Sequence, residues 1–249
     1  MKDEFNGGGT VFKKTAAGAA CVVAVLMTAG CGGASGGQAE GKASRQADSA
    51  SPSPTATAKP LSADALGEAL LTPEDMPAGW KVDEEHLDGT YQTDRQNLQG
   101  WKSPSASCNA FVARTNRAIG KPAAGVGRSL ENDEFDSVET RITSYRDDLA
   151  AAQNISQLRK IPAACREGGK AAGAKMAFKR WAAPTAGEES VGIQMNAMGF
   201  PFNVVQIREG ATVAELTFSP SSDTAFVEDV TQKAAARLKA AAQPSIQQD

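Results

Sequence analysis

Residues 189–219 read ESVGIQMNAMGFPFNVVQIREGATVAELTFS, and this stretch decides the fold. Apolar side chains recur at every second position in successive runs. Side chains of a strand point alternately to opposite faces, so this period predicts strands with one buried face. Gly199-Phe200-Pro201 and Glu209-Gly210 separate the runs with residues that favour tight turns. The stretch therefore predicts an antiparallel meander.

Helical spacing of apolar residues marks segments on both sides of this stretch. The segments begin near Ser62, Ser105, Asp147 and Asp223, and serine and aspartate are favoured residues at helix starts. In the third segment Pro162 lacks an N–H donor, so we expect it to disrupt the helix.

Shorter alternating runs at residues 126–131, 138–145 and 176–178 predict further strands. Helices and antiparallel strands then occur in separate blocks along the chain. The order of elements predicts an α+β fold, with a mainly antiparallel sheet of about five to six strands packed with helices.

The charge balance argues against one broad class of partner. The chain has 249 residues, 26 basic and 29 acidic side chains and a formal charge of −3. A nucleic-acid-binding domain needs a basic face to neutralise phosphates, so we expect no nucleic-acid partner. The densest basic patch, Lys170, Lys175, Lys179 and Arg180, is typical of a solvated edge strand.

The N-terminal segment has the layout of a secretory signal. Lys13 and Lys14 precede an uncharged run at residues 15–30, whose apolar centre is residues 22–27. A helix that spans a bilayer needs about 20 mainly apolar residues. This run is too short and too rich in alanine and glycine to meet that requirement.

Thr28-Ala29-Gly30-Cys31 ends this run and resembles a bacterial lipobox. The resemblance implies that Cys31 receives a diacylglyceryl group and that a dedicated peptidase then removes the signal peptide, residues 1–30. An ordinary secretory signal or an uncleaved anchor is the alternative. Residues 31–60 then comprise the lipidated cysteine and a linker rich in Gly, Ser, Pro and Thr. We expect this linker to be disordered, because it has too few apolar side chains to offset the entropy cost of ordering. Residues 61–249 are expected to form a single α+β extracytoplasmic domain.

Four cysteines leave one pair for this domain. Cys21 is expected to leave with the signal, and Cys31 to carry lipid. Cys108 and Cys165 remain, on the apolar sides of their expected helices, and an even pair in an oxidising compartment predicts a disulfide. Two buried free thiols are one alternative. A metal pair is the other, although two cysteines and one distant histidine make no standard site.

The sequence offers little for catalysis. His86 is the only histidine, so any Ser-His-Asp or Cys-His arrangement must include it. It stands in a polar segment, and the chain contains no nucleophile-elbow pattern. We expect a surface histidine and a non-enzymatic protein without cofactor or metal; a hydrolase that uses His86 is the alternative.

Apolar and aromatic residues at two places are candidates for a binding surface. Flexible methionine and phenylalanine at an expected hairpin tip suit an adaptable surface, and aromatic residues beside an irregular segment suit a pocket. Core packing is the alternative, and it is the simpler explanation for each residue taken alone. The candidates are Met195, Met198, Phe200, Phe202, Trp80 and Trp101.

The layout as a whole resembles actinobacterial lipoproteins, with a lipobox, a tether and a domain that opens at residues 70–80 as LLTPEDMPAGW. The cysteine pair and the late meander also resemble the extracytoplasmic sensor domains of PknH-type receptor kinases, over most of residues 61–242. Those domains usually have two disulfides, and residues 61–249 contain cysteines for one. No binding residue is therefore carried over.

These features predict a lipid-anchored protein on the extracytoplasmic face of the cell membrane. Its expected partners are the membrane, through Cys31, and an unknown small molecule or envelope protein. The predicted function is a non-enzymatic ligand-binding or sensor-like module. The alternative is a structural or assembly protein that acts through protein–protein contacts at the cell envelope.

Overall fold

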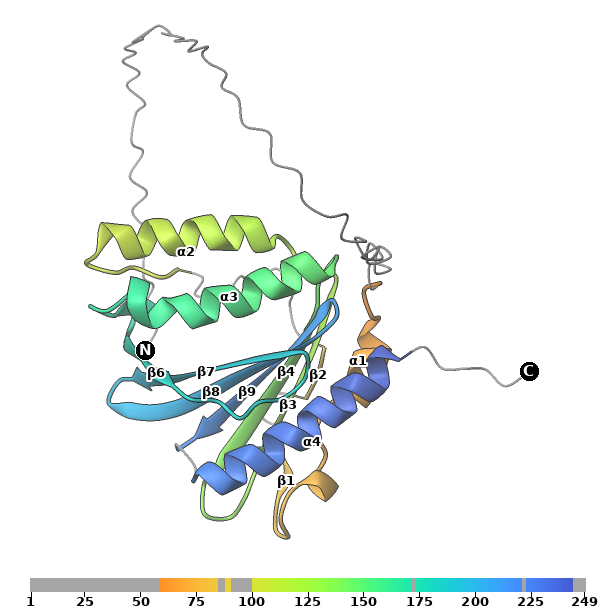
Figure 1. Ribbon diagram of the computed structural model, residues 1–249. Helices are drawn as coiled ribbons and strands as arrows, with labels where there is room; N and C mark the ends of the chain where they lie inside the picture. The colour runs from red at the N-terminus through yellow and green to blue at the C-terminus, as the bar shows by residue number, and fades with distance from the viewer. Residues whose placement is uncertain (1–58, 85–87, 91–99, 172, 221–222, 244–249) are drawn as a thin grey trace, which may run out of the picture. The chain divides into compact units, whose positions relative to one another are not determined.

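The computed structural model describes residues 59–84, 88–90, 100–171, 173–220 and 223–243, which form one sheet with helices against both faces (Figure 1). The helices are α1 (Ala63–Glu68), the 3-10 turn η1 (Pro73–Asp75), α2 (Ala106–Ile119), α3 (Asp148–Ala164) and α4 (Thr224–Ala242). The strands are β1 (Lys81–Val82), β2 (Asp88–Thr90), β3 (Ala124–Glu131), β4 (Ser137–Ser144), β5 (Gly169–Ala171), β6 (Ala174–Trp181), β7 (Glu189–Ala197), β8 (Phe200–Glu209) and β9 (Thr212–Ser219).

The described strands pair in the order β1-β3-β4-β9-β8-β7-β6-β5, with β2 also beside β3. All of these pairings are antiparallel. The α+β class and the meander of β7, β8 and β9 are confirmed. The expected number of strands, about five to six, is too low for the nine-stranded sheet. The short strands β1, β2 and β5 have two or three residues each, which is too few to show an alternating pattern.

The turn between β7 and β8 lies slightly earlier than the sequence suggested. Phe200 pairs with Ala197, which leaves Met198 and Gly199 as a two-residue turn. Both residues have positive φ, 53° and 96°, as expected for a hairpin turn that matches the twist of its strands. Pro201 lies within β8, so the glycine sets the turn and the proline does not.

The helices on the two faces of the sheet cover different sets of strands. On one face α3 packs against β6, β7, β8 and β9, and α2 packs on α3 (Figure 1). Ile155 of α3 lies in the same buried cluster as Phe178, Ile193 and Val204 of the sheet. On the other face α4 packs against β8 and β9, and α1 against β3 and β4. Among the described residues of β5 and β6, only Trp181, the last residue of β6, packs against the cluster that contains the buried face of α4.

The helix starts are confirmed in each case. The N-cap side chains of Ser62, Ser105, Asp147 and Asp223 each accept a hydrogen bond from a backbone N–H three residues further on. The expectation for Pro162 is wrong, because α3 continues to Ala164 with Pro162 buried inside it. The proline lies in the last turn of α3, so its missing N–H removes only one backbone hydrogen bond near the end of the helix.

Within the described ranges, no helix has the length and apolar character needed to cross a membrane.

Candidate functional site

A pocket of about 880 Å³ opens at the β5 end of the sheet. Its walls come from three places in the chain: residues 102–104 before α2, residues 167–170 and 175–177 in and just before β5 and β6, and residues 196–199 at the end of β7 and in the turn to β8. This volume lies within the range of small-molecule sites, roughly 300–1,000 Å³. The pocket is therefore large enough to hold a small-molecule ligand.

Three lysines form a row across one wall of the pocket. The backbone N–H of Lys102 donates to the carbonyl oxygen of Lys170 at 2.9 Å, and the N–H of Lys170 donates back at 2.8 Å. Lys170 is also the register partner of Lys175 on β6. Directly opposed residues of antiparallel strands point to the same face, so the three side chains project together, with Cβ atoms about 5 Å apart between neighbours.

The charge of this row is not neutralised within the described structure. All three lysines are exposed, and no described carboxylate oxygen lies within 4.0 Å of their ammonium groups. Glu167 is the one acidic residue among the pocket residues. Like charges placed directly opposite each other on a sheet are destabilising. The row therefore carries an electrostatic cost that a bound anion would remove.

The sequence indicated part of this wall. Lys170 and Lys175 belong to the basic patch expected at a strand edge, and β5 is indeed the last strand in the sheet order. Lys102 gave no signal, because only the pairing with β5 brings it into the row. Ala177 and Asn196 also line the pocket, and neither residue type is distinctive in sequence.

The hairpin-tip candidates separate into two groups. Met198 lines the pocket with 70% of its surface exposed, and Phe200 is 67% exposed beside it. Met195 is half-buried against the core cluster beneath α3, and its register partner Phe202 is half-buried as well. Met198 and Phe200 are thus the two tip side chains that are free to contact a partner.

The two tryptophan candidates lie in different buried clusters. Trp80 stacks on Phe226 of α4, with ring centroids 5.5 Å apart. Trp101 is buried against Phe178, with centroids 5.3 Å apart, and it immediately precedes the lysine row. A Cβ atom placed on Gly169 would lie 2.5 Å from the Trp101 ring, so Trp101 supports the wall of the pocket from behind.

The Cys108–Cys165 disulfide is confirmed, with a Cα–Cα distance of 4.9 Å and both residues fully buried. It joins the first turn of α2 to the residue that ends α3. The indole N–H of Trp101 donates to the sulfur of Cys108 at 3.2 Å. The disulfide therefore fixes the segment that carries Lys102 relative to β5, which follows Cys165 closely in sequence.

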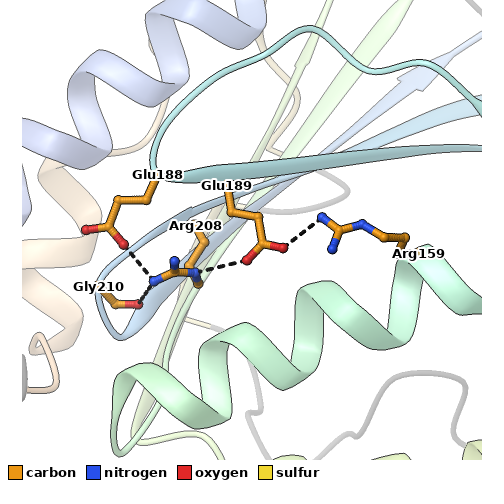
Figure 2. Close-up of polar contacts among 5 residues, drawn as sticks. All are labelled: Arg159, Glu188, Glu189, Arg208 and Gly210. Carbon is orange, nitrogen blue, oxygen red and sulfur yellow. Dashed lines mark hydrogen bonds and ion pairs between the residues drawn. The ribbon is translucent and has the colours of Figure 1, made fainter. Parts of the chain in front are cut away.

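A second charged cluster, at the opposite end of the β7–β8 hairpin, is fully paired (Figure 2). Arg208 donates to Glu188 at 2.6 Å, to Glu189 at 3.4 Å and to the carbonyl oxygen of Gly210 at 3.2 Å. Arg159 of α3 donates to the other oxygen of Glu189 at 2.7 Å. These charges hold α3, β7 and β8 together, in contrast to the lysines of the pocket.

The carboxyl of Glu215, on the sheet, has a raised pKa. Burial raises the pKa of Glu215, and a hydrogen bond from the side-chain amide of Gln206 at 2.7 Å opposes that rise only in part. Glu215 lies on β9, distant in the sheet order from the pocket strands β5 and β6. We therefore treat it as a determinant of stability.

Several expectations concern residues outside the described ranges, namely Cys21, Cys31, His86 and the linker up to residue 58. The described part of the chain holds no group of three or more His, Cys, Asp or Glu side chains arranged to bind a metal ion.

The structure was compared with known proteins and with solved structures. No protein-family model matches the chain, and no curated protein matches it significantly. The extracellular domain of PknH from Mycobacterium tuberculosis resembles the structure with a TM-score of 0.48 and 10% sequence identity, over 74% of this chain and 99% of that domain. The likeness to this domain is loose. The assignment to actinobacterial lipoproteins stays a prediction.

Proposed function

We propose that the chain is a membrane-anchored extracytoplasmic lipoprotein whose domain is a non-enzymatic ligand-binding, sensor-like module, with the ligand in the pocket at the β5 end of the sheet. The observation that carries the proposal is the unneutralised lysine row in the wall of a pocket large enough for a small molecule. Three lysines on one face repel one another, and a bound anion would reduce this repulsion, so their arrangement favours a ligand-binding site.

The chemistry of the pocket residues favours binding over catalysis. Ser103 is the only hydroxyl among them, and its Oγ donates to the carbonyl oxygen of Gly168 at 2.7 Å. The same oxygen accepts from the backbone N–H of Ser105 at 3.2 Å. A nucleophilic serine needs a base as its hydrogen-bond acceptor, and Ser103 instead uses its proton to hold the backbone of the pocket wall.

The anchoring part of the proposal rests on the sequence around Cys31. A thiol after Ala29-Gly30, preceded by a short apolar run, supports lipidation at this residue. Its test is the distribution of Cys31→Ala protein between membrane and soluble fractions. We expect the variant to leave the membrane fraction, and normal processing with full retention in the membrane would contradict the anchor.

Native mass spectrometry of the full chain, extracted from its own membrane in mild detergent, tests the binding function. We expect a discrete small-molecule adduct on the wild-type chain and a marked loss of that adduct in Met198→Asp. The alternative, an assembly protein, predicts no adduct. It predicts instead a crosslinked envelope protein that is lost when Met198→Asp and Phe200→Asp are combined, because the exposed tip would be the contact.

A further inference from the structure

We propose that the ligand of this pocket is an anionic amphiphile with a phosphate headgroup, whose phosphate lies on the lysine row and whose apolar part lies against Met198. This inference rests on the proposed function and names the chemistry of its ligand. It follows from three features of the pocket: the number of converging cations, the apolar side chains beside them, and the excess of positive over negative charge among the described pocket residues.

The cations match a group that carries several anionic oxygens. Lys102, Lys170 and Lys175 belong to three neighbouring backbone segments and share one face. With Glu167 as the one acidic pocket residue, three positive charges and one negative charge leave a formal charge of +2 at the pocket. Lysine ammonium groups on flexible stems act as point charges that close around phosphate. A phosphate can accept hydrogen bonds from all three ammonium groups at once.

The apolar side chains lie directly beside the end of this row. The backbone N–H of Met198 donates to the carbonyl oxygen of Lys175 at 3.0 Å, so the β7–β8 turn continues the line of the lysines. Met176 and Ala177 line the same pocket. Methionine is unbranched and polarisable, which lets it pack against ligands of varied shape. A phosphate on the lysines therefore leaves the rest of its molecule in contact with apolar atoms.

The conformation of Met198 supports a role at this position. Its φ of 53° lies in the left-handed region that residues other than glycine, asparagine and aspartate rarely adopt. Its side chain is nevertheless 70% exposed, so little core burial compensates for the strained backbone. A large apolar side chain held at a pocket rim in this way is suited to cover a bound apolar group.

Strand β6 provides a matched control for charge. Lys179 is four residues beyond Lys175, on the same face and also exposed, but it is not among the residues that line the pocket. Lys175→Glu and Lys179→Glu change the net charge of the protein identically. A ligand held by the pocket distinguishes the two variants, whereas general attraction between protein and anion does not.

The test uses the full chain carrying Cys31→Ser, which cannot be lipidated there, with ¹³C-labelled methionine methyl groups. The chain has six methionines, of which Met176 and Met198 line the pocket. Their signals are assigned from Met176→Leu and Met198→Leu. The probes are dihexanoylphosphatidylglycerol, dihexanoylphosphatidylcholine and inorganic phosphate, each titrated below any micelle-forming concentration.

We expect dihexanoylphosphatidylglycerol to shift both pocket methyl signals saturably, and to bind more tightly than either other probe. Lys175→Glu should weaken this binding by about tenfold or more, and Lys179→Glu by less than about twofold. If inorganic phosphate binds as tightly as the lipid, the proposal that the ligand is an amphiphile is wrong. If dihexanoylphosphatidylcholine binds as tightly as dihexanoylphosphatidylglycerol, or if the two lysine variants weaken binding equally, the proposal that the lysine row binds an anionic headgroup is wrong.

These failures are distinct from failure of the proposed function. A shift of the pocket methyl signals by phosphatidylcholine alone would contradict the ligand chemistry and still show an occupied pocket. No shift with any probe would overturn the inference, and the adduct in the native mass spectrum would then decide the binding function separately.

Discussion

Lys102 and Lys170 exchange two backbone hydrogen bonds, each N–H donating to the carbonyl oxygen of the other at 2.9 and 2.8 Å. This pair brings the segment before α2 against the outer edge of β5. It also places two lysine side chains on one face at the wall of the pocket. The geometry of the candidate site therefore depends on how α2 is held, which makes the disulfide and Trp101 part of its support.

Removal of the disulfide should destabilise the whole domain. The bridge joins residues separated by 57 positions, and in the chain-entropy model a loop of that size contributes about 4 kcal/mol. We expect the combined variant Cys108→Ala and Cys165→Ala to lose roughly this free energy of unfolding in urea denaturation. A loss below about 1 kcal/mol would show that α2 and α3 are held by packing alone.

Gly169→Ala should disturb the pocket wall directly. A Cβ atom at this position would lie 2.5 Å from the Trp101 ring and 2.6 Å from the carbonyl oxygen of Lys102. Because Trp101 is buried and cannot move freely, we expect a loss of about 1–3 kcal/mol in the free energy of unfolding. Gly67→Ala in α1 is the control, since nothing lies within 4 Å of its added Cβ. Gly67→Ala should stabilise the protein by about 0.5–1 kcal/mol. If Gly67→Ala instead destabilises the protein as much as Gly169→Ala does, the steric clash at Gly169 is not the cause.

Arg208 should matter more to stability than Arg159, its neighbour in the same network (Figure 2). The Arg208 side chain is 16% exposed and bonds three partners, whereas Arg159 is half-exposed and bonds one. We expect Arg208→Met to cost about 2 kcal/mol, because it leaves Glu188 and Glu189 without their shared cation. Arg159→Met should cost less than about 1 kcal/mol. Thermal or urea unfolding of the two variants measures the difference, and equal costs would contradict this ranking.

Glu215 should make the protein less stable as the pH rises. Burial raises the pKa of this carboxyl, so the folded chain keeps its proton to higher pH than the unfolded chain, which releases it near 4.5. The free energy of unfolding therefore falls as the pH rises from that value through the raised pKa. Glu215→Gln keeps an acceptor for Gln206 and carries no charge.

We expect Glu215→Gln to be more stable than wild type at pH 7, with the difference vanishing below pH 4.5. Melting temperatures measured across this pH range check the prediction. Glu134→Gln, at an exposed position of the β3–β4 turn, should change stability by less than about 0.5 kcal/mol. A pH-independent effect of Glu215→Gln would mean that packing, not ionisation, is responsible.

The sequence predicted those parts of the fold that are governed by local periodicity. The helix beginning after Ser105, with Cys108 on its apolar side, and the meander of β7–β9 both follow from spacing within one segment. The disulfide followed from the parity of the cysteines together with the expected compartment. Short strands such as β5 escaped prediction because long-range pairing, rather than pattern, forms them.

The candidate site was only partly predictable for the same reason. Met198 is a candidate from sequence because flexible apolar side chains at a hairpin tip suit an adaptable surface, and it lines the pocket. Lys102 joins the row through a pairing with Lys170 that no local pattern encodes. Trp101 was expected near a pocket, and the structure places it behind the wall because Gly169 leaves room for its ring.

The central claim, that a ligand occupies this pocket, is tested most directly by filling the pocket. Ala177 is exposed and lines it, whereas Lys179 is exposed on the same strand outside it. Native mass spectrometry of the full-length wild-type, Ala177→Trp and Lys179→Trp chains compares the occupancy of the co-purified adduct. We predict that wild type and Lys179→Trp carry the adduct and that Ala177→Trp has lost it. Equal occupancy in all three chains would contradict the account.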